Sequence, residues 1–148
     1  MLFFVSCSLS PKVTESQSIF MLIKTPNLKY ADNGFIRRFG DDLQVQLFNA
    51  GSLALELKIS KDICINGICY SKRQFNSKFL HSVYPDDFLE NLILKREIFG
   101  SIGRKKLSDG FSQDILKDGL NISYKVSQKT SIFKDGKNLI FVKILHLN

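Results

Sequence analysis

The side chains best suited to chemistry in this chain are few, and none stands in a catalytic pattern. Asp86, Asp87 and Glu90 are spaced closely enough for an acid–base pair, and His81 and His146 are the two histidines. The acidic trio follows a proline, and acidic residues there favour the start of a helix. Neither histidine has a motif partner, and no G-x-S-x-G, HExxH, CxxC or GxxxxGK[ST] occurs. The sequence therefore predicts no enzyme, no metal and no cofactor.

Two of the three cysteines flank a tight turn. An Asn-Gly pair between β-branched residues favours a two-residue type I′ turn, and residues 66–67 form such a pair. That turn places Cys64 opposite Cys69 at a separation that a disulfide spans. The prediction is a disulfide between them, with two reduced core thiols or a redox pair as the alternatives.

The third cysteine belongs to a processing signal. Residues 4–7, Phe-Val-Ser-Cys, resemble a bacterial lipobox, in which a small residue precedes the cysteine that is lipidated. We expect residues 1–6 to be the remainder of a signal peptide that starts upstream, and residues 7–18 to be a tether lipidated at Cys7. Ser8 after the cysteine resembles an outer-membrane destination. The alternative is a buried apolar strand with an incidental cysteine.

Apolar and polar residues alternate along most of the chain, as they do in strands of an antiparallel sheet with one buried face. Five or six meandering strands, a helical insertion and two or three further strands are expected. The predicted strands cover residues 19–24, 34–39, 43–48 and 53–59, the hairpin 63–70, residues 120–126, and a last hairpin turned at Asp135-Gly136 that ends in 139–147.

The pattern changes to a helical period after residue 70. Ser71 and Gln74 have capping-box spacing, and a second helix follows Pro85. Residues 100–119 contain several glycines and are expected to be rich in loops. The predicted apolar helix faces consist of Phe75, Phe79, Leu80 and Val83 in the first helix and Phe88, Leu89, Leu92 and Ile93 in the second.

Length and composition set the organisation. The 148 residues, 44% hydrophobic and 24% charged, predict a single folded domain over residues 19–148 without a spanning helix. The net charge of +7 is uneven, because residues 61–148 have 15 basic and 9 acidic side chains. The basic residues are mostly scattered through apolar alternation, which disfavours nucleic acid as a partner.

The order of these elements resembles the outer-membrane lipoprotein receptor LolB and, more distantly, the periplasmic carrier LolA. Residues 45–57 resemble the family's paired strands around a turn, and residues 84–94 resemble its proline-led helix. Tyr124 and the hairpin at Asp135-Gly136 resemble its C-terminal end. The expected fold is therefore mainly β with a helical insertion (α+β), a curled antiparallel sheet or open β-barrel with a helical lid.

The resemblance implies a lipoprotein of the outer membrane, facing the periplasm, that accepts acyl chains in an apolar cavity. Its expected partners are lipoprotein acyl chains, a periplasmic lipoprotein carrier and outer-membrane lipids. For each candidate wall residue, a plain core position is the alternative. The candidates are Phe20, Leu22, Phe35, Val45, Leu47, Leu55, Leu57, Phe88, Leu92 and Tyr124.

The family's turn inserts a leucine into the membrane, and the corresponding turn here lacks it. Phe48, Asn49, Ala50 and Gly51 are the candidates for that role. A solvated loop, with head-group contacts as the alternative, is expected for Lys95, Arg96, Arg104, Lys105 and Lys106. The competing functions are a lipid-anchored structural or protein-interaction module of the cell envelope and a carrier of another lipid.

Overall fold

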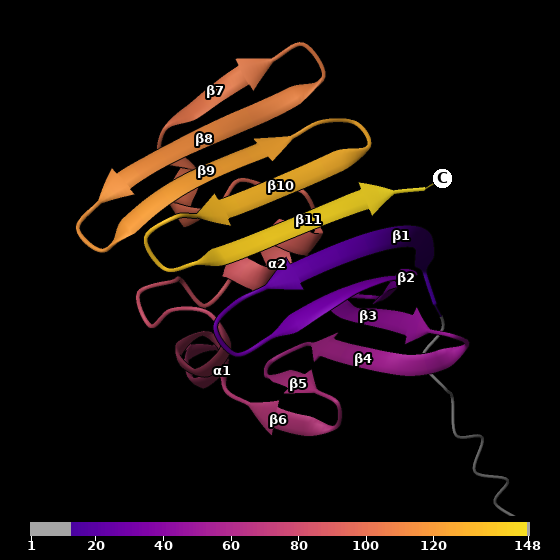
Figure 1. The fold of residues 1–148 in the computed structure, drawn as a ribbon. Coiled ribbons are helices and arrows are strands. Elements are labelled where there is room, and N and C mark those ends of the chain that lie inside the picture. Colours follow the sequence, from indigo (N-terminus) through magenta and orange to yellow (C-terminus); the bar gives the residue numbers. More distant parts are fainter. Residues whose placement is uncertain (1–12, 148) are drawn as a thin grey trace, which may run out of the picture.

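Eleven antiparallel strands form one sheet, and two α-helices lie against one of its faces in this computed structural model, which describes residues 13–147 (Figure 1). The expected class, mainly antiparallel β with a helical insertion, is confirmed. The strands are β1 (Glu15–Lys24), β2 (Lys29–Phe39), β3 (Asp42–Asn49), β4 (Ser52–Ile59), β5 (Ile63–Ile65), β6 (Ile68–Tyr70), β7 (Arg104–Leu107), β8 (Gly110–Lys117), β9 (Leu120–Val126), β10 (Thr130–Asp135) and β11 (Ile140–His146). The helices are α1 (Lys72–Phe79) and α2 (Phe88–Ile93), followed by the 3-10 turn η1 (Phe99–Ser101).

The sheet consists of two meanders joined in the middle. Its order is β6-β5-β4-β3-β2-β1-β11-β10-β9-β8-β7, so the first and last strands are neighbours. Strands β6 and β7 are the two edges, and residues 71–103, here called the helical segment, connect one edge to the other. Figure 1 shows this segment crossing one face of the sheet, which we call the inner face.

Strict alternation explains why the inner face is apolar. In β3 the buried side chains are Leu43, Val45 and Leu47, while the residues between them face outward. Strand β9 alternates in the same way from Leu120 to Val126. A side-chain period of two puts every second residue on one face, so these strands bury one row and expose the other.

Two glycines allow the sheet to bend. A Cβ added to Gly34 in β2 would lie 1.8 Å from the Gln46 carbonyl oxygen in β3. A Cβ on Gly110 in β8 would lie 1.9 Å from the Val126 carbonyl oxygen in β9. Each half of the sheet therefore contains one position where only glycine permits neighbouring backbones to come so close.

Local turn and cap chemistry matches the predictions. Asn66 and Gly67 have φ values of 49° and 84°, as a type I′ turn requires, and Cys64 pairs with Cys69 in the predicted register. The capping box of α1 is present, with the Ser71 side chain accepting from the backbone N–H of Gln74 and the Gln74 side chain accepting from Ser71.

Three segments differ from the predictions. Strand β1 begins at Glu15, inside the expected tether, because residues 15–18 pair with β2 despite their polar side chains. The expected loop at 100–119 contains β7 and β8, since 108–109 and 118–119 form tight turns between strands. Helix α1 ends at Phe79, so Val83 is 54% exposed rather than part of an apolar helix face.

Candidate functional site

The inner face of β3 and β4 is an aliphatic wall. Val45, Leu47, Leu55 and Leu57 are all fully buried there, on adjacent strands in register. The other inward positions of β1–β5 are also apolar along most of their length. We call this surface the aliphatic wall. It consists of Ile19, Met21, Ile23, Ile36, Leu43, Val45, Leu47, Leu55, Leu57, Ile59, Ile63 and Ile65.

Seven of the ten candidate cavity residues lie on the inner side. Besides the four on β3 and β4, these are Phe88 and Leu92 on α2 and Tyr124 on β9.

The other three, Phe20, Leu22 and Phe35, are partly exposed on the outer face of β1 and β2. Their neighbours in sequence occupy the inner positions instead. In a continuous apolar run such as 19–23, composition does not reveal which alternate residues turn inward.

Aromatic rings pack between the helical segment and the C-terminal strands. Phe88 of α2 lies with its ring centroid 4.9 Å from Phe133 of β10 and 4.7 Å from Tyr84. Phe99 and Tyr124 contact the same group, at 6.0 Å from Phe88 and 6.3 Å from Phe133. Such edge and tilted contacts add to simple burial. These rings pack the helical segment closely against the inner face of the C-terminal strands.

Buried polar side chains of the C-terminal strands hold the helical segment. Gln113 of β8 is fully buried, accepts from the Ile98 N–H at 2.9 Å, and donates to the carbonyls of Ile98 and Ile102 at 2.8 Å. The Tyr124 hydroxyl donates to the Arg96 carbonyl at 3.0 Å. Because these side chains pair with backbone groups of Arg96, Ile98 and Ile102, the contacts fix residues 96–102 on the sheet.

Asp135 provides a third attachment. Its carboxylate accepts from the Tyr84 hydroxyl at 2.6 Å and from the Asn138 side-chain amide at 2.7 Å. It also accepts backbone N–H groups, including that of Asn121 at 3.2 Å. We call Gln113, Tyr124 and Asp135 the polar anchors.

The ionisation of these groups follows from their surroundings. Burial of Asp135 would by itself raise its pKa, but the bonds from Tyr84, Asn138 and Asn121 outweigh burial and lower the pKa. Burial and then the Asp135 carboxylate raise the pKa of Tyr84. Burial and then the charge of Glu97 raise that of Tyr124. The anchors therefore combine neutral tyrosine donors with an ionised carboxylate at neutral pH.

Helix α1 is attached to the other half of the sheet. The Asn27 side chain, in the β1–β2 turn, donates to the Lys78 carbonyl at 2.7 Å. The Tyr70 ring of β6 lies 5.5 Å from Phe79, and its hydroxyl accepts from the Lys78 ammonium at 3.1 Å. Within the helical segment, Asn76 donates to the Pro85 carbonyl at 2.9 Å, which links α1 to the chain that leads into α2.

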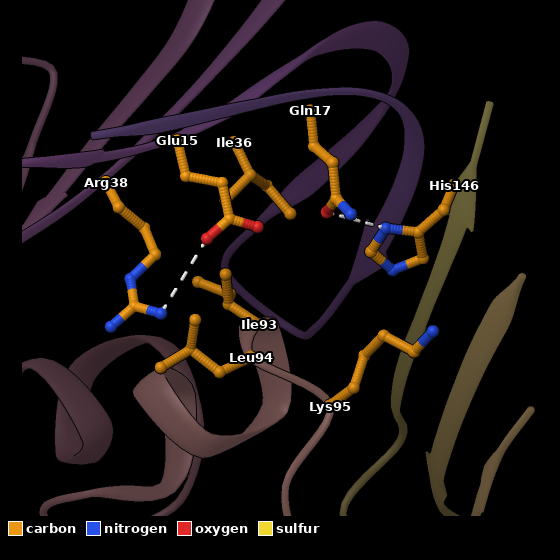
Figure 2. Close-up of a pocket in the computed structure, with 8 residues that line it drawn as sticks. All are labelled: Glu15, Gln17, Ile36, Arg38, Ile93, Leu94, Lys95 and His146. Carbon is orange, nitrogen blue, oxygen red and sulfur yellow. Dashed lines mark hydrogen bonds and ion pairs between the residues drawn. The ribbon is translucent and has the colours of Figure 1, made fainter. Parts of the chain in front are cut away.

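A polar pocket of about 150 Å³ opens where β1 and β2 extend past the end of β11 (Figure 2). His146 is 5% exposed and its Nδ1 lies 3.0 Å from the Gln17 side-chain oxygen, while no hydrogen bond reaches its Nε2 from the described residues. Burial, followed by the charge of Lys95, lowers the pKa of His146. The lining residues are Glu15, Gln17, Ile36, Arg38, Ile93, Leu94, Lys95 and His146.

The other predicted site residues have the following places. Cys64 and Cys69 form a disulfide in the β5–β6 hairpin. Cys7 lies outside the described residues. Phe48 pairs with Leu53 at an irregularity in the β3–β4 register, and Asn49, Ala50 and Gly51 form the exposed turn beside them. Leu53 is 50% exposed. Strict alternation over residues 53–59 predicts that it faces inward, but the register irregularity places it opposite Phe48 instead.

The basic candidates for head-group contact do not converge on one site. Lys95 donates to the Gln128 carbonyl at 2.6 Å, and Arg104 is paired with Glu97 at 2.6 Å. The side chains of Arg96, Lys105 and Lys106 are exposed.

The acidic trio stays at the start of α2. Asp87 occupies the N-cap position without a side-chain hydrogen bond, Asp86 is exposed, and Glu90 lies in the first turn. Residues 13–147 contain no group of three or more potential metal-ligating side chains. Over the same range, neither helix has the length and apolar character needed to cross a membrane.

Fold and site define a class of protein: an open, mainly antiparallel β-sheet whose apolar inner face is covered by a short helical segment. Comparison of the sequence with protein-family models and with curated proteins matched none.

Proposed function

We propose that this chain is a LolB-like receptor that binds the acyl chains of lipoproteins against the aliphatic wall and delivers them to the outer membrane. One observation supports this most strongly. The wall is a continuous apolar surface, and the polar anchors that hold residues 96–102 and Tyr84 all come from the other half of the sheet. The part of the helical segment from Tyr84 to Ile102, which includes α2, is attached in this way and is suited to moving off the wall without losing its attachment.

The energetics of an acyl chain fit such a surface. Each buried CH₂ contributes about 0.8 kcal/mol, so a chain of ordinary length offsets the loss of the packing between α2 and the wall. Leu92 and Ile93 of α2 are buried in the same apolar cluster as the wall, and an acyl chain would replace contacts of this kind. Apolar packing of this kind is non-directional, and an acyl chain replaces it without leaving polar groups unpaired.

The proposal includes a membrane anchor and defined partners. Lipidation at Cys7 would hold the domain at the outer membrane on its periplasmic side, where a soluble lipoprotein carrier hands over its cargo. Phe48 and the turn 49–51 would contact the bilayer, with exposed Leu53 in place of the leucine that the turn lacks. No cofactor and no catalytic step are needed for this exchange.

A transfer assay tests the proposal. The full chain is mixed with a lipoprotein that is held by its periplasmic carrier, and the amount of lipoprotein that changes partner is measured. Leu57→Trp crowds the wall and is expected to reduce transfer by at least tenfold, while the outward-facing Glu56→Gln on the same strand leaves it unchanged. Thermal unfolding of both variants controls for loss of the fold.

A photo-reactive acyl chain on the lipoprotein gives a readout that needs no variant. Crosslinks are expected on Val45, Leu47, Leu55 and Leu57. Absence of both transfer and crosslinks on the inner face would reject the proposal and favour a lipid-anchored interaction module. Crosslinks from a free phospholipid without transfer of a lipoprotein would instead identify a carrier of another lipid.

A further inference from the structure

The outer face of the sheet contains a regular array of lysines on β1 and on the C-terminal strands. Their positions follow from the strand register, because each has the outward parity of its strand. Asp114 is the acidic residue among the outward positions of these strands. The array consists of Lys24, Lys105, Lys125, Lys134 and Lys143.

Apolar residues separate the four lysines of β1 and β9–β11 across the strands. Lys143 of β11 stands between Leu22 of β1 and Ile132 of β10, and Ile132 in turn stands next to Lys125 of β9. In the neighbouring row Phe141 stands between two lysines, one on each side. With strands about 4.8 Å apart, the alternation extends over roughly 15 Å.

The charges of this array are unneutralised. Within residues 13–147 the ion pairs involve Arg38, Lys58 and Arg104, so none of the five array lysines belongs to one. The apolar residues beside them, such as Leu22 and Ile132, are only partly buried. A face that presents both free positive charge and partly exposed apolar side chains matches a surface with negative charge above an apolar layer.

We propose that the outer face of β1 and β9–β11 docks onto a membrane surface that contains anionic phospholipids. The lysines contact lipid phosphates and the intervening Leu, Ile and Phe side chains reach the boundary of the acyl region. The same face continues toward Phe20, Phe35 and Phe48, and the latter two rings are in contact at 6.1 Å. The docking does not depend on the acyl site, which lies on the inner side of the sheet.

The chemistry of the array favours lipid over nucleic acid. All five basic residues are lysines, whereas arginine is the side chain suited to bidentate contacts with phosphates and bases. Between the lysines of β1 and β9–β11 the outward residues that alternate with them are aliphatic or phenylalanine, rather than hydrogen-bonding groups that read a polynucleotide backbone. Ser112 lies between Lys125 and Lys105.

Vesicle co-sedimentation of the unlipidated full chain tests the docking. The vesicles are phosphatidylcholine alone or phosphatidylcholine with one third phosphatidylglycerol. Binding is expected only to the anionic vesicles, and it should weaken as salt is added. The variant Lys125→Gln/Lys134→Gln/Lys143→Gln should lower the partition coefficient about 100-fold, since each lysine near an anionic surface contributes about fivefold.

The matched control removes the same charge elsewhere. Lys61→Gln/Arg73→Gln/Lys117→Gln changes three exposed basic residues outside the array and should reduce binding by less than about threefold. Equal losses in the two variants, or no binding to anionic vesicles, would overturn the proposal. Binding to a short RNA but not to anionic vesicles would assign the face to nucleic acid and also overturn it.

The docking proposal and the acyl-binding proposal can be rejected independently of each other. The array variant should still take up acyl chains from detergent solution, because its substitutions lie on the opposite face from the aliphatic wall. Loss of acyl uptake in Leu57→Trp with unchanged vesicle binding would leave the docking surface in place.

Discussion

The two halves of the sheet bury different chemistry. The buried side chains on the inner face of β1–β5 are all apolar, and Glu15, Gln17 and Arg38 line the pocket at one end of that face. The inner face of β8–β11 contains the buried polar residues Gln113, Ser131, Asp135 and His146 among aromatic rings. The longer part of the helical segment, from Tyr84 to Ile102, is hydrogen-bonded to this second half.

The two halves of the sheet therefore contact the helical segment by different kinds of interaction. A hydrogen bond to a buried polar group is directional and is lost abruptly when its partner moves. Aliphatic contact tolerates replacement of one apolar partner by another. The C-terminal half therefore determines where Tyr84 to Ile102 lie, while the aliphatic contacts of the N-terminal half constrain the position of their partners less strictly.

The largest expected effect comes from removing the carboxylate of Asp135. Asp135→Ala leaves Tyr84, Asn138 and the Asn121 N–H without their charged acceptor. Chemical denaturation should show a loss of about 4 kcal/mol in the free energy of unfolding. Glu56→Ala, which removes an outer-face carboxylate of the N-terminal half, should cost about 1 kcal/mol or less. Similar losses would contradict the contrast between the halves.

A smaller and more local effect is expected at Gln113. Gln113→Leu removes the partner of the Ile98 N–H and of the Ile102 carbonyl and one of the two bonds to the Ile98 carbonyl, and should cost about 2 kcal/mol. Hydrogen exchange should accelerate in residues 96–103 and stay unchanged in α1. Asn27→Ala removes the bond to the Lys78 carbonyl. It should accelerate hydrogen exchange in α1 and leave exchange in residues 96–103 unchanged. Acceleration of both regions in either variant would mean that the helical segment moves as one body.

The smallest expected effect is a pH dependence from His146. Its folded pKa lies below the ordinary value of about 6.5, because of burial and of Lys95. The unfolded chain therefore takes up this proton first as the pH falls, and the free energy of unfolding should decrease below pH about 6.5 until the folded pKa is passed. Glu15, Arg38 and Lys95 also line the pocket. The part of the pH dependence that is due to His146 is therefore found by comparing the free energy of unfolding with that of His146→Gln at each pH. Identical pH profiles of the two proteins would refute the assignment.

Features set by local chemistry were predictable from the sequence. The Asn66-Gly67 turn fixed the hairpin register because only positive φ fits there, and Ser71 with Gln74 marked the start of α1. The aliphatic rows of β3 and β4 followed from clean alternation. Strands β7 and β8 were missed because the glycines of residues 100–119 predict loops, whereas Gly110 and Gly119 lie at the tight turns that join these strands.

The polar anchors could not be predicted from local sequence patterns. Gln113 is satisfied by backbone 15 residues away, and Asp135 bonds Tyr84 across 51 residues. Only the packing of distant segments reveals that such side chains are buried and paired. The same holds for Phe20, Leu22 and Phe35, whose outward direction depends on pairing with strands far along the chain.

The pairing of β1 with β11 has a consequence for how the molecule assembles. Ile19 pairs with His146, so the central strand pair forms only after nearly all of the described chain has been synthesised and, in an exported protein, translocated. Until then the long strand β1 presents a free edge that another strand is able to join. Contacts so distant in sequence also slow folding. The interval before β11 arrives is therefore when the nascent chain most needs protection by a chaperone from mispairing.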